Sequence, residues 1–528
     1  MGAPETPLEP PPGTPWMLRL RRRLARWGAH PDAHKLPAAD TTITALPLPP
    51  RLVLPLAQHI GAPARPVVQA GEHVLRGQVL AAAQGALSAP VHAPTSGRVL
   101  GIGEAGMPHP SGLGAPAILL APDGQDEALP PIETDPFTLT PADIARRVAE
   151  AGIVGMGGAT FPAAVKLSLG QGGAIPTLIL NGGECEPYLS CDDRLMRERP
   201  TEVVDGARII ARAIGARRIL IGVESNKPQA IAALRLAAAG FEGIEVVAVP
   251  SRYPMGSEKQ LIAWLTGHEV PAAGRSAEVG VVVHNVGTAA AIHRALRFGE
   301  PLTRRIVTVA GAAVRTPRNL EVRIGTPVSA LLEFCGGLIA EPARLVMGGP
   351  MMGMAIRSTE VPVIKGSGGV LALTAEEIAA PDAAAPCIRC GACVGACPIG
   401  LLPLEMAARI RADDHAAAAA LGLRDCIGCG TCSFVCPSRI PLVQYFNHAK
   451  GELAARERDR ARQQSIRELV EARSLRMARE AREKAEAAAR RKAERERAKA
   501  QAATPKTNSQ ADGGRDDRTA AAGVGADA

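Results

Sequence analysis

Eight of the eleven cysteines in this 528-residue chain fall into two copies of one pattern, which limits the possible folds more than any other feature. Each copy has the form Cys-x-x-Cys-x-x-Cys-x-x-x-Cys-Pro, beginning at Cys387 and at Cys426. Three thiolates spaced three residues apart can line one short loop around three iron corners of a cubane cluster. The fourth thiolate must approach from elsewhere, and in two-cluster ferredoxins it comes from the other copy. The sequence therefore predicts two 4Fe-4S clusters and a role in moving electrons.

The ligands expected for each cluster follow from this exchange of the fourth cysteine. One cluster is expected to bind Cys387, Cys390, Cys393 and Cys436, and the other Cys426, Cys429, Cys432 and Cys397. The alternative is two zinc sites, but these usually pair two Cys-x-x-Cys knuckles and leave no use for a third and fourth cysteine at these offsets. Between the copies, residues 401–424 predict two short helices, so residues 375–448 are expected to form a helical dicluster ferredoxin module. Outside the motifs, Cys335 is expected to be a small buried hydrophobe.

The formal net charge of +8 comes almost entirely from one segment. Residues 450–500 hold 17 basic and 10 acidic side chains, and the rest of the chain is close to neutral. The many Glu–Arg pairs predict a solvent-exposed charged helix at residues 449–500, with a partner-binding arm as the alternative. A basic tail is not a basic groove, and no aromatic platforms alternate with arginines, so nucleic acid is not an expected ligand. Residues 501–528 are expected to be disordered.

Two features bear on location: the lengths of the apolar runs and the composition of the N-terminal arm. No run of 18 or more apolar residues occurs and no signal peptide is recognised, which favours a cytoplasmic location. Residues 1–45 are expected to form an arm whose basic segment, Trp16 to Trp27, has leucines on one helical side and arginines on the other. This pattern is typical of a helix that docks on a membrane surface or a partner, and a solvated basic arm is the alternative.

Residues 46–130 alternate short β-like runs with Gly and Pro turns. The runs Pro66 to Leu80 and Ser88 to Val99 look like a biotinyl/lipoyl-type barrel-sandwich hybrid of two small sheets. Carrier domains of that type need a lysine on an exposed hairpin, but the matching turn here, His92 to Gly97, contains none. A docking role is therefore favoured over covalent carriage.

Residues 135–300 alternate helical and strand-like segments, which predicts an α/β layer with sites at the carboxyl ends of its strands. The expected strands are 177–180, 219–223, 245–249 and 281–283. Residues 303–356 are rich in β-like runs, with one helix expected at Val328 to Phe334. The complete prediction is a multidomain chain of α/β and β domains.

A glycine-rich loop precedes the first of these strands. Gly155, Gly157 and Gly158 expose backbone N–H groups where a helix can begin, which suits a phosphate, and Lys166 lies within reach of the same ligand. A glycine turn that serves only tight packing is the alternative. After the strand at 177–180 come Asn181, Glu184 and Glu186, and later strand-like runs lead to Glu258, Asn285 and Thr288. Acids and amides at strand ends suit the hydroxyl and amide groups of a nucleotide.

These motifs occur in the order Gly-x-Gly-Gly-x-x-Phe161-Pro, Asn-x-x-Glu-x-Glu-Pro, Gly-x-Glu and Asn-Val-x-Thr. This order resembles the flavin- and NADH-binding subunit of respiratory complex I. Over about residues 28–450, with the dicluster module at the end, the chain is similar to the RnfC family of Rnf ion-translocating oxidoreductases. That family implies a β-grasp ligand-binding-like domain at residues 301–360. It also implies bound FMN, reaction with NAD(H), and electron passage to membrane subunits.

The resemblance assigns roles residue by residue. Gly155, Gly157, Gly158, Lys166 and Asn181 would hold FMN; Phe161 and Glu186 would face the nicotinamide nucleotide; Glu184 and Glu258 would line the shared cavity; and Asn285 and Thr288 would close the flavin end. The chain departs from the complex I pattern at Met156, where a basic residue is usual, and at Gly183, where an acid is usual. Tyr188 and Leu189 replace the usual Gly-Thr.

The family further implies a peripheral subunit on the cytoplasmic side of the inner membrane that couples NAD(H) to ferredoxin through membrane partners. No catalytic nucleophile is expected, because the cofactors carry the chemistry. Two alternatives remain: a soluble cobalamin reductase of the related type, and a cluster-bearing docking adaptor without nucleotide chemistry. Met156 and Gly183 are the features that favour the adaptor.

Overall fold

The computed structural model describes residues 27–109, 111–173, 175–378 and 384–503. The basic segment expected from Trp16 to Trp27 lies outside these residues except for its last position, as do residues 504–528 of the expected disordered tail. Of the described residues, those up to Lys450 form one compact unit, and those from Gly451 onward form a second. None of the described helices combines the length and the apolar character that crossing a bilayer requires.

Two small antiparallel sheets form the first domain. One sheet has the strand order β2 (Leu52–Pro55), β8 (Gly114–Pro122), β7 (Gly97–Gly106), β4 (His73–Val74), and the other has the order β3 (Arg65–Pro66), β5 (Val79–Ala82), β6 (Val91–His92). The turn between β6 and β7 is buried, because Thr95 and Ser96 are fully buried and donate to Asp126 (2.9 Å) and Asp123 (2.7 Å). This turn is therefore packed into the domain and is not presented to solvent.

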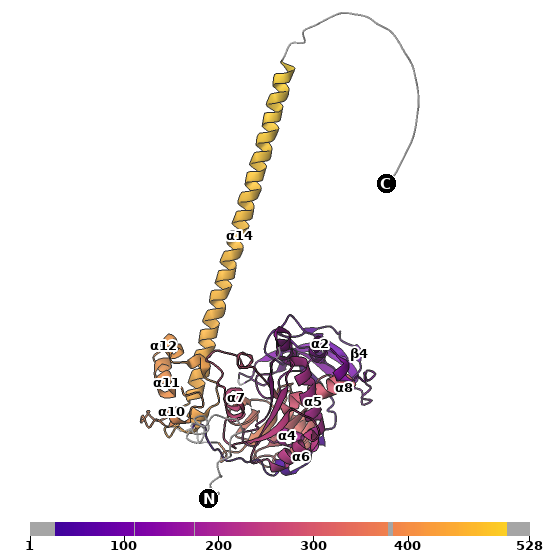
Figure 1. Cartoon of the computed structure of the whole chain (residues 1–528), viewed down its shortest axis with the longest axis vertical. Coiled ribbons are helices and arrows are strands. Elements are labelled where there is room, and N and C mark those ends of the chain that lie inside the picture. Colours follow the sequence, from indigo (N-terminus) through magenta and orange to yellow (C-terminus); the bar gives the residue numbers. More distant parts are fainter. Residues whose placement is uncertain (1–26, 110, 174, 379–383, 504–528) are drawn as a thin grey trace, which may run out of the picture. The chain divides into compact units, whose positions relative to one another are not determined.

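A four-stranded parallel sheet is the centre of the second domain (Figure 1). Its order is β11 (Ile244–Val249), β10 (Arg218–Glu224), β9 (Thr177–Gly182), β12 (Val281–Asn285), which confirms the four strands expected from the sequence. Continuous apolar runs such as Val281–Val283 suit strands buried on both faces. The helices of this domain are α2 (Pro141–Glu150), α3 (Ala163–Leu167), α4 (Cys191–Glu198), α5 (Pro200–Ile214), α6 (Pro228–Ala238), α7 (Glu258–Thr266) and α8 (Val286–Phe298).

Local features fix the register of these helices at the sheet. An ideal Cβ at Gly206 in α5 would lie 1.9 Å from the carbonyl oxygen of Ala289 in α8, so only glycine allows the two helices to approach this closely. Asn285 ends β12 and caps α8, since its Oδ1 accepts a hydrogen bond from Gly287 N (2.8 Å). Asn285 is also the register partner of Asn181 across β12 and β9. The two asparagines therefore meet at the carboxyl edge of the sheet.

A six-stranded mixed sheet follows. Its order is β1 (Thr44–Ala45), β14 (Arg318–Arg323), β13 (Arg304–Ala310), β17 (Gly369–Leu373), β15 (Arg344–Met347), β16 (Met354–Ile356). The one helix expected here is confirmed as α9 (Val328–Phe334). The sheet extends beyond the expected range of 301–360, because β1 pairs with β14 and β17 pairs with both β13 and β15.

The cysteine motifs lie among short helices: α10 (Ala392–Ala396), α11 (Pro403–Arg411), α12 (His415–Ala420) and α13 (Thr431–Phe434). The two helices expected between the motifs are confirmed as α11 and α12. The two copies fold alike, since Gly391 and Gly430 each precede a helix with φ of 77°. Such a left-handed conformation favours glycine at both positions.

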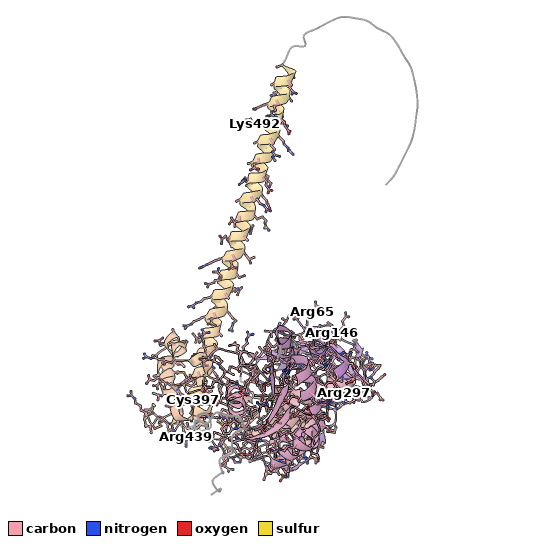
Figure 2. All side chains as sticks on the ribbon, viewed as in Figure 1. Arg65, Arg146, Arg297, Cys397, Arg439 and Lys492 are labelled. Atoms are coloured by element: carbon pink, nitrogen blue, oxygen red, sulfur yellow. The ribbon has the colours of Figure 1, made fainter. Side chains whose placement is uncertain are left out.

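The chain then continues into α14 (Leu442–Ala502), which confirms the long charged helix. Figure 2 shows its side chains projecting into solvent along the helix, and residues 456–502 are all exposed. Pairs spaced four residues apart, such as Arg482 and Glu486 (3.0 Å), support it. Its expected alternative, a partner-binding arm, stays a prediction.

Candidate cofactor sites

Two asparagines organise the carboxyl edge of the parallel sheet. Asn181 donates from Nδ2 to the carbonyl oxygen of Gly256 (2.7 Å) and accepts from Gly183 N (2.9 Å). Asn285 donates from Nδ2 to Asp192 Oδ2 (2.6 Å). These bonds join the ends of β9 and β12 to the Gly256 loop and to α4. In open α/β sheets this edge is where ligands bind.

The glycine loop lies beside this edge. Met156 N donates to Thr288 Oγ1 (3.0 Å), and an ideal Cβ at Gly157 would lie 3.0 Å from the Cβ of Asn285. At Gly158, with φ of 155°, no atom lies within 4 Å of the position that a Cβ would take. The loop therefore presents bare backbone to open space next to the N-terminus of α8. This arrangement fits a phosphate-bearing cofactor such as FMN.

Lys166 and Glu258 form an ion pair at the same edge. Lys166 Nζ lies 3.1 Å from Glu258 Oε2 and also donates to the carbonyl oxygen of Val283 (3.0 Å). Both side chains stay partly exposed, at 28% and 42%. Phe161 is half-buried and closes the glycine loop, because its carbonyl oxygen accepts from Gly155 N (2.8 Å). The expected contacts of Lys166 with FMN and of Phe161 with the nucleotide stay predictions.

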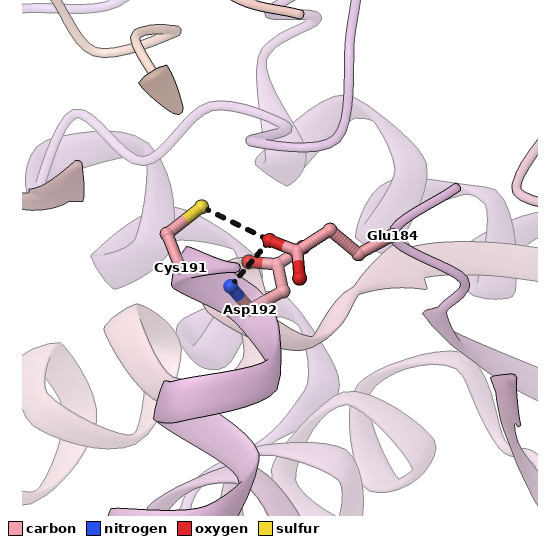
Figure 3. A group of neighbouring side chains, drawn as sticks. All are labelled: Glu184, Cys191 and Asp192. Carbon is pink, nitrogen blue, oxygen red and sulfur yellow. Dashed lines mark hydrogen bonds between the residues drawn. The ribbon is translucent and has the colours of Figure 1, made fainter. Parts of the chain in front are cut away.

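Glu184 caps α4 and is 7% exposed. Its carboxylate accepts hydrogen bonds from Asp192 N (2.8 Å) and from the Cys191 thiol (3.3 Å), as Figure 3 shows. Burial raises the pKa of the carboxyl groups of Glu184 and Asp192, and it raises the pKa of the Cys191 thiol well above its usual value. The thiol is therefore protonated and acts as a donor. Although the ligand atoms of these three side chains lie within 4.8 Å of one another, the group is explained by helix capping and does not require a metal.

Glu186 points into the turn that follows β15. Its two carboxylate oxygens accept from Met351 N (3.0 Å) and Met352 N (2.8 Å). Burial raises the pKa of Glu186 to about 7, and the two N–H groups oppose that rise. The structure thus engages Glu186 with the backbone of the β domain. Its expected contact with the nicotinamide nucleotide stays a prediction.

Tyr188 and Leu189, two of the departures from the complex I pattern, pack into the β domain. Tyr188 is buried with Ala310, Val346 and Leu371, and Leu189 packs against the same cluster. An ideal Cβ at Gly369 would lie 2.2 Å from Leu189 Cδ2, so the two segments are in close contact. These larger side chains therefore bind the loop after Glu186 to a neighbouring domain.

Two lysines that sequence reasoning missed, the partly buried Lys35 and the buried Lys227, hold the loop from Glu184 to Leu189. Lys35 Nζ donates to the carbonyl oxygens of Glu184 (2.8 Å), Glu186 (3.0 Å) and Leu189 (2.5 Å). Lys227 is 2% exposed, forms an ion pair with Glu224 and lies 3.3 Å from the Glu184 carbonyl oxygen. All three ammonium protons of Lys35 are satisfied by backbone. A lone lysine in an irregular segment gives no periodic signal from which this role could have been found.

Arg305 was also missed, and it brings a buried cation to the glycine loop from β13. Its side chain donates to the carbonyl oxygen of Ser367 (3.1 Å) and contacts the sulfur of Met156. Among the residues that the structure describes, neither of these partners is a carboxylate. Burial lowers the pKa of Arg305, and Asp192 opposes that change. Arg305, Met156 and Asp192 line one cavity. A buried cation without a bonded anion is costly, so this position favours an anionic ligand. The complex I pattern usually has a basic residue at the position of Met156. Here the positive charge beside the glycine loop comes from Arg305, in another domain.

The motif cysteines gather in two sets around two cavities. The Cys387 set comprises Cys387, Cys390, Cys393 and Cys436, and the Cys426 set comprises Cys397, Cys426, Cys429 and Cys432. Each set takes three cysteines from one copy and one from the other. These are the same two sets that the spacing predicts, and four thiols around one cavity fit a cubane cluster.

Backbone N–H groups point at several of these sulfurs. Arg389 N donates to Cys387 Sγ, Leu401 N to Cys397 Sγ and Gly428 N to Cys426 Sγ, each at 3.4 Å. Such N–H···S bonds stabilise cluster sulfurs and tune their potential. Burial raises the pKa of Cys432 to about 12, so its proton must be displaced by the positive charge of iron.

Four family models match the chain in the order of its domains. They are described as the RnfC barrel sandwich hybrid domain (residues 25–125), the Nuo51 FMN-binding domain (148–294), the SLBB domain (306–355) and the 4Fe-4S dicluster domain (386–440). Together with the geometry above, they define the class: a multidomain iron–sulfur flavoprotein subunit of an oxidoreductase, with FMN and 4Fe-4S clusters as cofactors.

Relatives of known name identify the family. A protein of Rhodobacter capsulatus, named as the C subunit of an ion-translocating oxidoreductase complex, is 54% identical over 436 residues, which are 82% of this chain and 83% of that protein. Its namesake in Pseudomonas aeruginosa is 47% identical over 86% of this chain and 59% of that protein. The chain belongs to the RnfC family, the C subunits of ion-translocating oxidoreductase complexes.

A comparison with solved structures matches part of the chain to the NAD+-reducing [NiFe]-hydrogenase in its H2-reduced state. The two sequences are 19% identical, and the matched region covers 61% of this chain and 62% of the hydrogenase chain, with a TM-score of 0.43. A likeness this low carries no argument about function.

Proposed function

We propose that this chain is the subunit that exchanges electrons between NAD(H) and the membrane subunits of an ion-translocating complex, through FMN and two 4Fe-4S clusters. One observation carries the proposal: the open glycine loop and both cysteine sets lie in a single compact unit, residues 1–450. Within that unit the hydroxyl of Tyr253, from the α/β domain, donates to the carbonyl oxygen of Cys429 (2.6 Å). The domain that carries the proposed flavin site is thus in direct contact with the module that carries the cysteine sets.

The residues proposed to hold FMN surround the glycine loop. The loop glycines Gly155, Gly157 and Gly158 offer backbone N–H groups, and Asn285 and Thr288 position the loop against α8. Arg305 adds a buried positive charge beside it, and Lys166 and Asn181 lie at the same sheet edge. FMN, when bound, supplies the exchange between a hydride donor and one-electron acceptors.

Two of the residues proposed to receive NAD(H), Glu184 and Glu186, lie on the adjoining loop. Glu184 and Glu186 are fixed there by the α4 N-terminus and by the turn at Met351, and Phe161 and Glu258 border the same edge. Their task is to orient the nicotinamide against the flavin and to keep water out. A rigid loop suits that task, since hydride transfer depends on the distance and angle between the two rings.

The partners proposed for this chain come from its family. Its relatives are named as subunits of ion-translocating complexes, so we propose that electrons pass to or from further subunits of such a complex. We place the chain on the cytoplasmic side of the inner membrane, where NAD(H) and ferredoxin are available, and propose that the complex couples these two pools.

The test is an anaerobic reconstitution of the full chain with iron, sulfide and FMN, followed by addition of NADH. We expect the flavin absorbance to bleach and reduced-cluster EPR signals to appear. If clusters form but NADH changes neither signal, the docking-adaptor alternative is favoured and the nucleotide assignment is wrong. If reduction proceeds and added cobalamin is reduced as fast as the clusters, the cobalamin-reductase alternative is favoured.

A further inference from the structure

The two cysteine sets differ in how they contact the rest of the compact unit. Four hydrogen bonds between the dicluster module and residues that precede it in the chain end within one residue of a cysteine of the Cys426 set. Two of them come from side chains: Tyr253 Oη donates to the carbonyl oxygen of Cys429 (2.6 Å), and Gln260 Nε2 donates to the carbonyl oxygen of Pro398 (2.7 Å). The other two come from backbone N–H groups. Gly28 N donates to the carbonyl oxygen of Ala396 (2.9 Å), and Ala273 N donates to the carboxylate of Asp425 (3.0 Å). Gln260 lies in α7, a helix labelled in Figure 1, and Tyr253 lies in the loop that precedes this helix.

A further contact leads from the proposed nucleotide loop to the Cys426 set. The turn whose N–H groups bind Glu186 also meets the second motif, since an ideal Cβ at Gly430 would lie 3.0 Å from the carbonyl oxygen of Met351. Gly430 directly follows Cys429. One turn of the β domain therefore touches the loop that carries Glu186 on one side and the loop that carries Cys429 on the other.

The exposure of the cysteines follows the same division. Cys387 and Cys390 are exposed, and Ile388 between them is 69% exposed. In the Cys426 set, Cys429 and Cys432 are buried and Cys397 and Cys426 are of intermediate exposure. The Cys387 set also contains the buried Cys393 and Cys436 of intermediate exposure. The Cys387 set thus has two exposed cysteines, whereas the Cys426 set has none and its loops contact the domain that carries the glycine loop.

We infer that the two clusters act in series: the Cys426 set exchanges electrons with the flavin site, and the Cys387 set exchanges them with the external carrier. This inference rests on the proposed function. Each hydride taken from NADH brings two electrons, which pass singly through the Cys426 set and then the Cys387 set to a one-electron carrier protein. The carrier is reduced twice per NADH, NAD+ is released, and the proton of the hydride goes to water. Reversal of all steps gives the opposite direction.

The first test removes one cluster at a time. In Cys387→Ala/Cys390→Ala the remaining cluster should still give a reduced-cluster EPR signal when NADH is added. In Cys426→Ala/Cys429→Ala the remaining cluster should be reduced by dithionite but at least about 100-fold more slowly by NADH, with FMN content unchanged. Wild-type-like reduction by NADH in the second variant would overturn the inference, although the proposed function would stand. Absence of NADH reduction in the unmodified chain would instead contradict the proposed function.

The second test needs no variant and no turnover, so it covers the case in which a variant fails to fold. The reconstituted chain is treated briefly with ferricyanide, and freed thiols are trapped with iodoacetamide and located by mass spectrometry. The Cys387 set, including Cys436, should be labelled before the Cys426 set, including Cys397. Labelling in the reverse order, or of both sets together, would show that the Cys387 set is not the solvent-facing one.

Discussion

The dicluster module and the α/β domain form their sites in different ways. Each four-thiol site draws on two short segments that fold alike, and the side chains that matter are the cysteines themselves. The sheet-edge site draws on a loop, several strand ends and two other domains, and its contacts include Lys35 from the N-terminal segment and Arg305 from β13. Each four-thiol site, built from local repeats, depends on a few ligands. The sheet-edge site is assembled from several domains and depends on many contacts, each of modest effect.

The largest effect should therefore come from a single cysteine. In Cys432→Ala one cluster should be lost, which lowers iron and sulfide content by about half. The matched control is Cys335→Ala, since Cys335 is equally buried but belongs to neither set. Its iron content should be unchanged. Full iron content in Cys432→Ala, by metal analysis, would show that the site does not depend on its ligands as described.

The pH dependence of Glu186 tests one support of the assembled site. Its pKa is raised to about 7 in the folded chain, from a usual value of 4.5. The folded state then binds more protons than the unfolded state between these values, so this group's contribution to stability falls as pH rises from 4.5 to 7. Relative to Glu186→Gln, the wild type should lose on the order of 3 kcal/mol across that window and little above it. If the unfolding midpoints of the wild type and of Glu186→Gln changed with pH in the same way, the pKa of Glu186 would not be raised in the folded chain.

Removing the buried cation should weaken flavin binding specifically. We expect Arg305→Met to raise the Kd for FMN by about 10- to 100-fold, because hydrogen bonds to charged groups contribute about 1.5–3 kcal/mol. The stability of the cofactor-free chain should stay the same or rise, since a desolvated charge is lost. The control is Arg304→Met, at the neighbouring, more exposed position. Equal effects of the two variants on FMN affinity, by fluorescence titration, would rule out a direct role for Arg305.

The glycine loop should show a smaller effect. Gly158→Ala places a methyl group where no protein atom lies within 4 Å, and Gly337→Ala does the same in the β domain, also at positive φ. Both changes should cost a similar 1 kcal/mol or so of stability. Only Gly158→Ala should raise the Kd for FMN, by about tenfold. Unchanged FMN affinity would mean that the open space at Gly158 is not the cofactor site.

This difference also explains what the sequence could predict. The cysteine sets, the four parallel strands and α9, α11, α12 and α14 follow from spacing and periodicity, which are local signals. The asparagines and the glycine loop were found because they stand at strand ends and in a short motif.

The residues that hold the sheet-edge site together from other domains show no recognisable spacing or periodicity in the sequence. Arg305 replaces a charge missing at Met156 from about 150 residues away, and only the fold brings the two together. The two cysteine copies are the same in spacing, so no sequence pattern could show that one set has two exposed cysteines and the other has none. That distinction depends on contacts such as the one between Tyr253 and Cys429.

The central claim is that the route from nucleotide to clusters lies within one chain. The most direct measurement mixes the reconstituted chain with NADH, follows the flavin by stopped flow, and follows the clusters by freeze-quench EPR at several chain concentrations. The account predicts that flavin reduction comes first and that cluster reduction follows with a rate constant independent of chain concentration. A cluster rate that rises in proportion to chain concentration would show that electrons pass between chains, which would contradict the account.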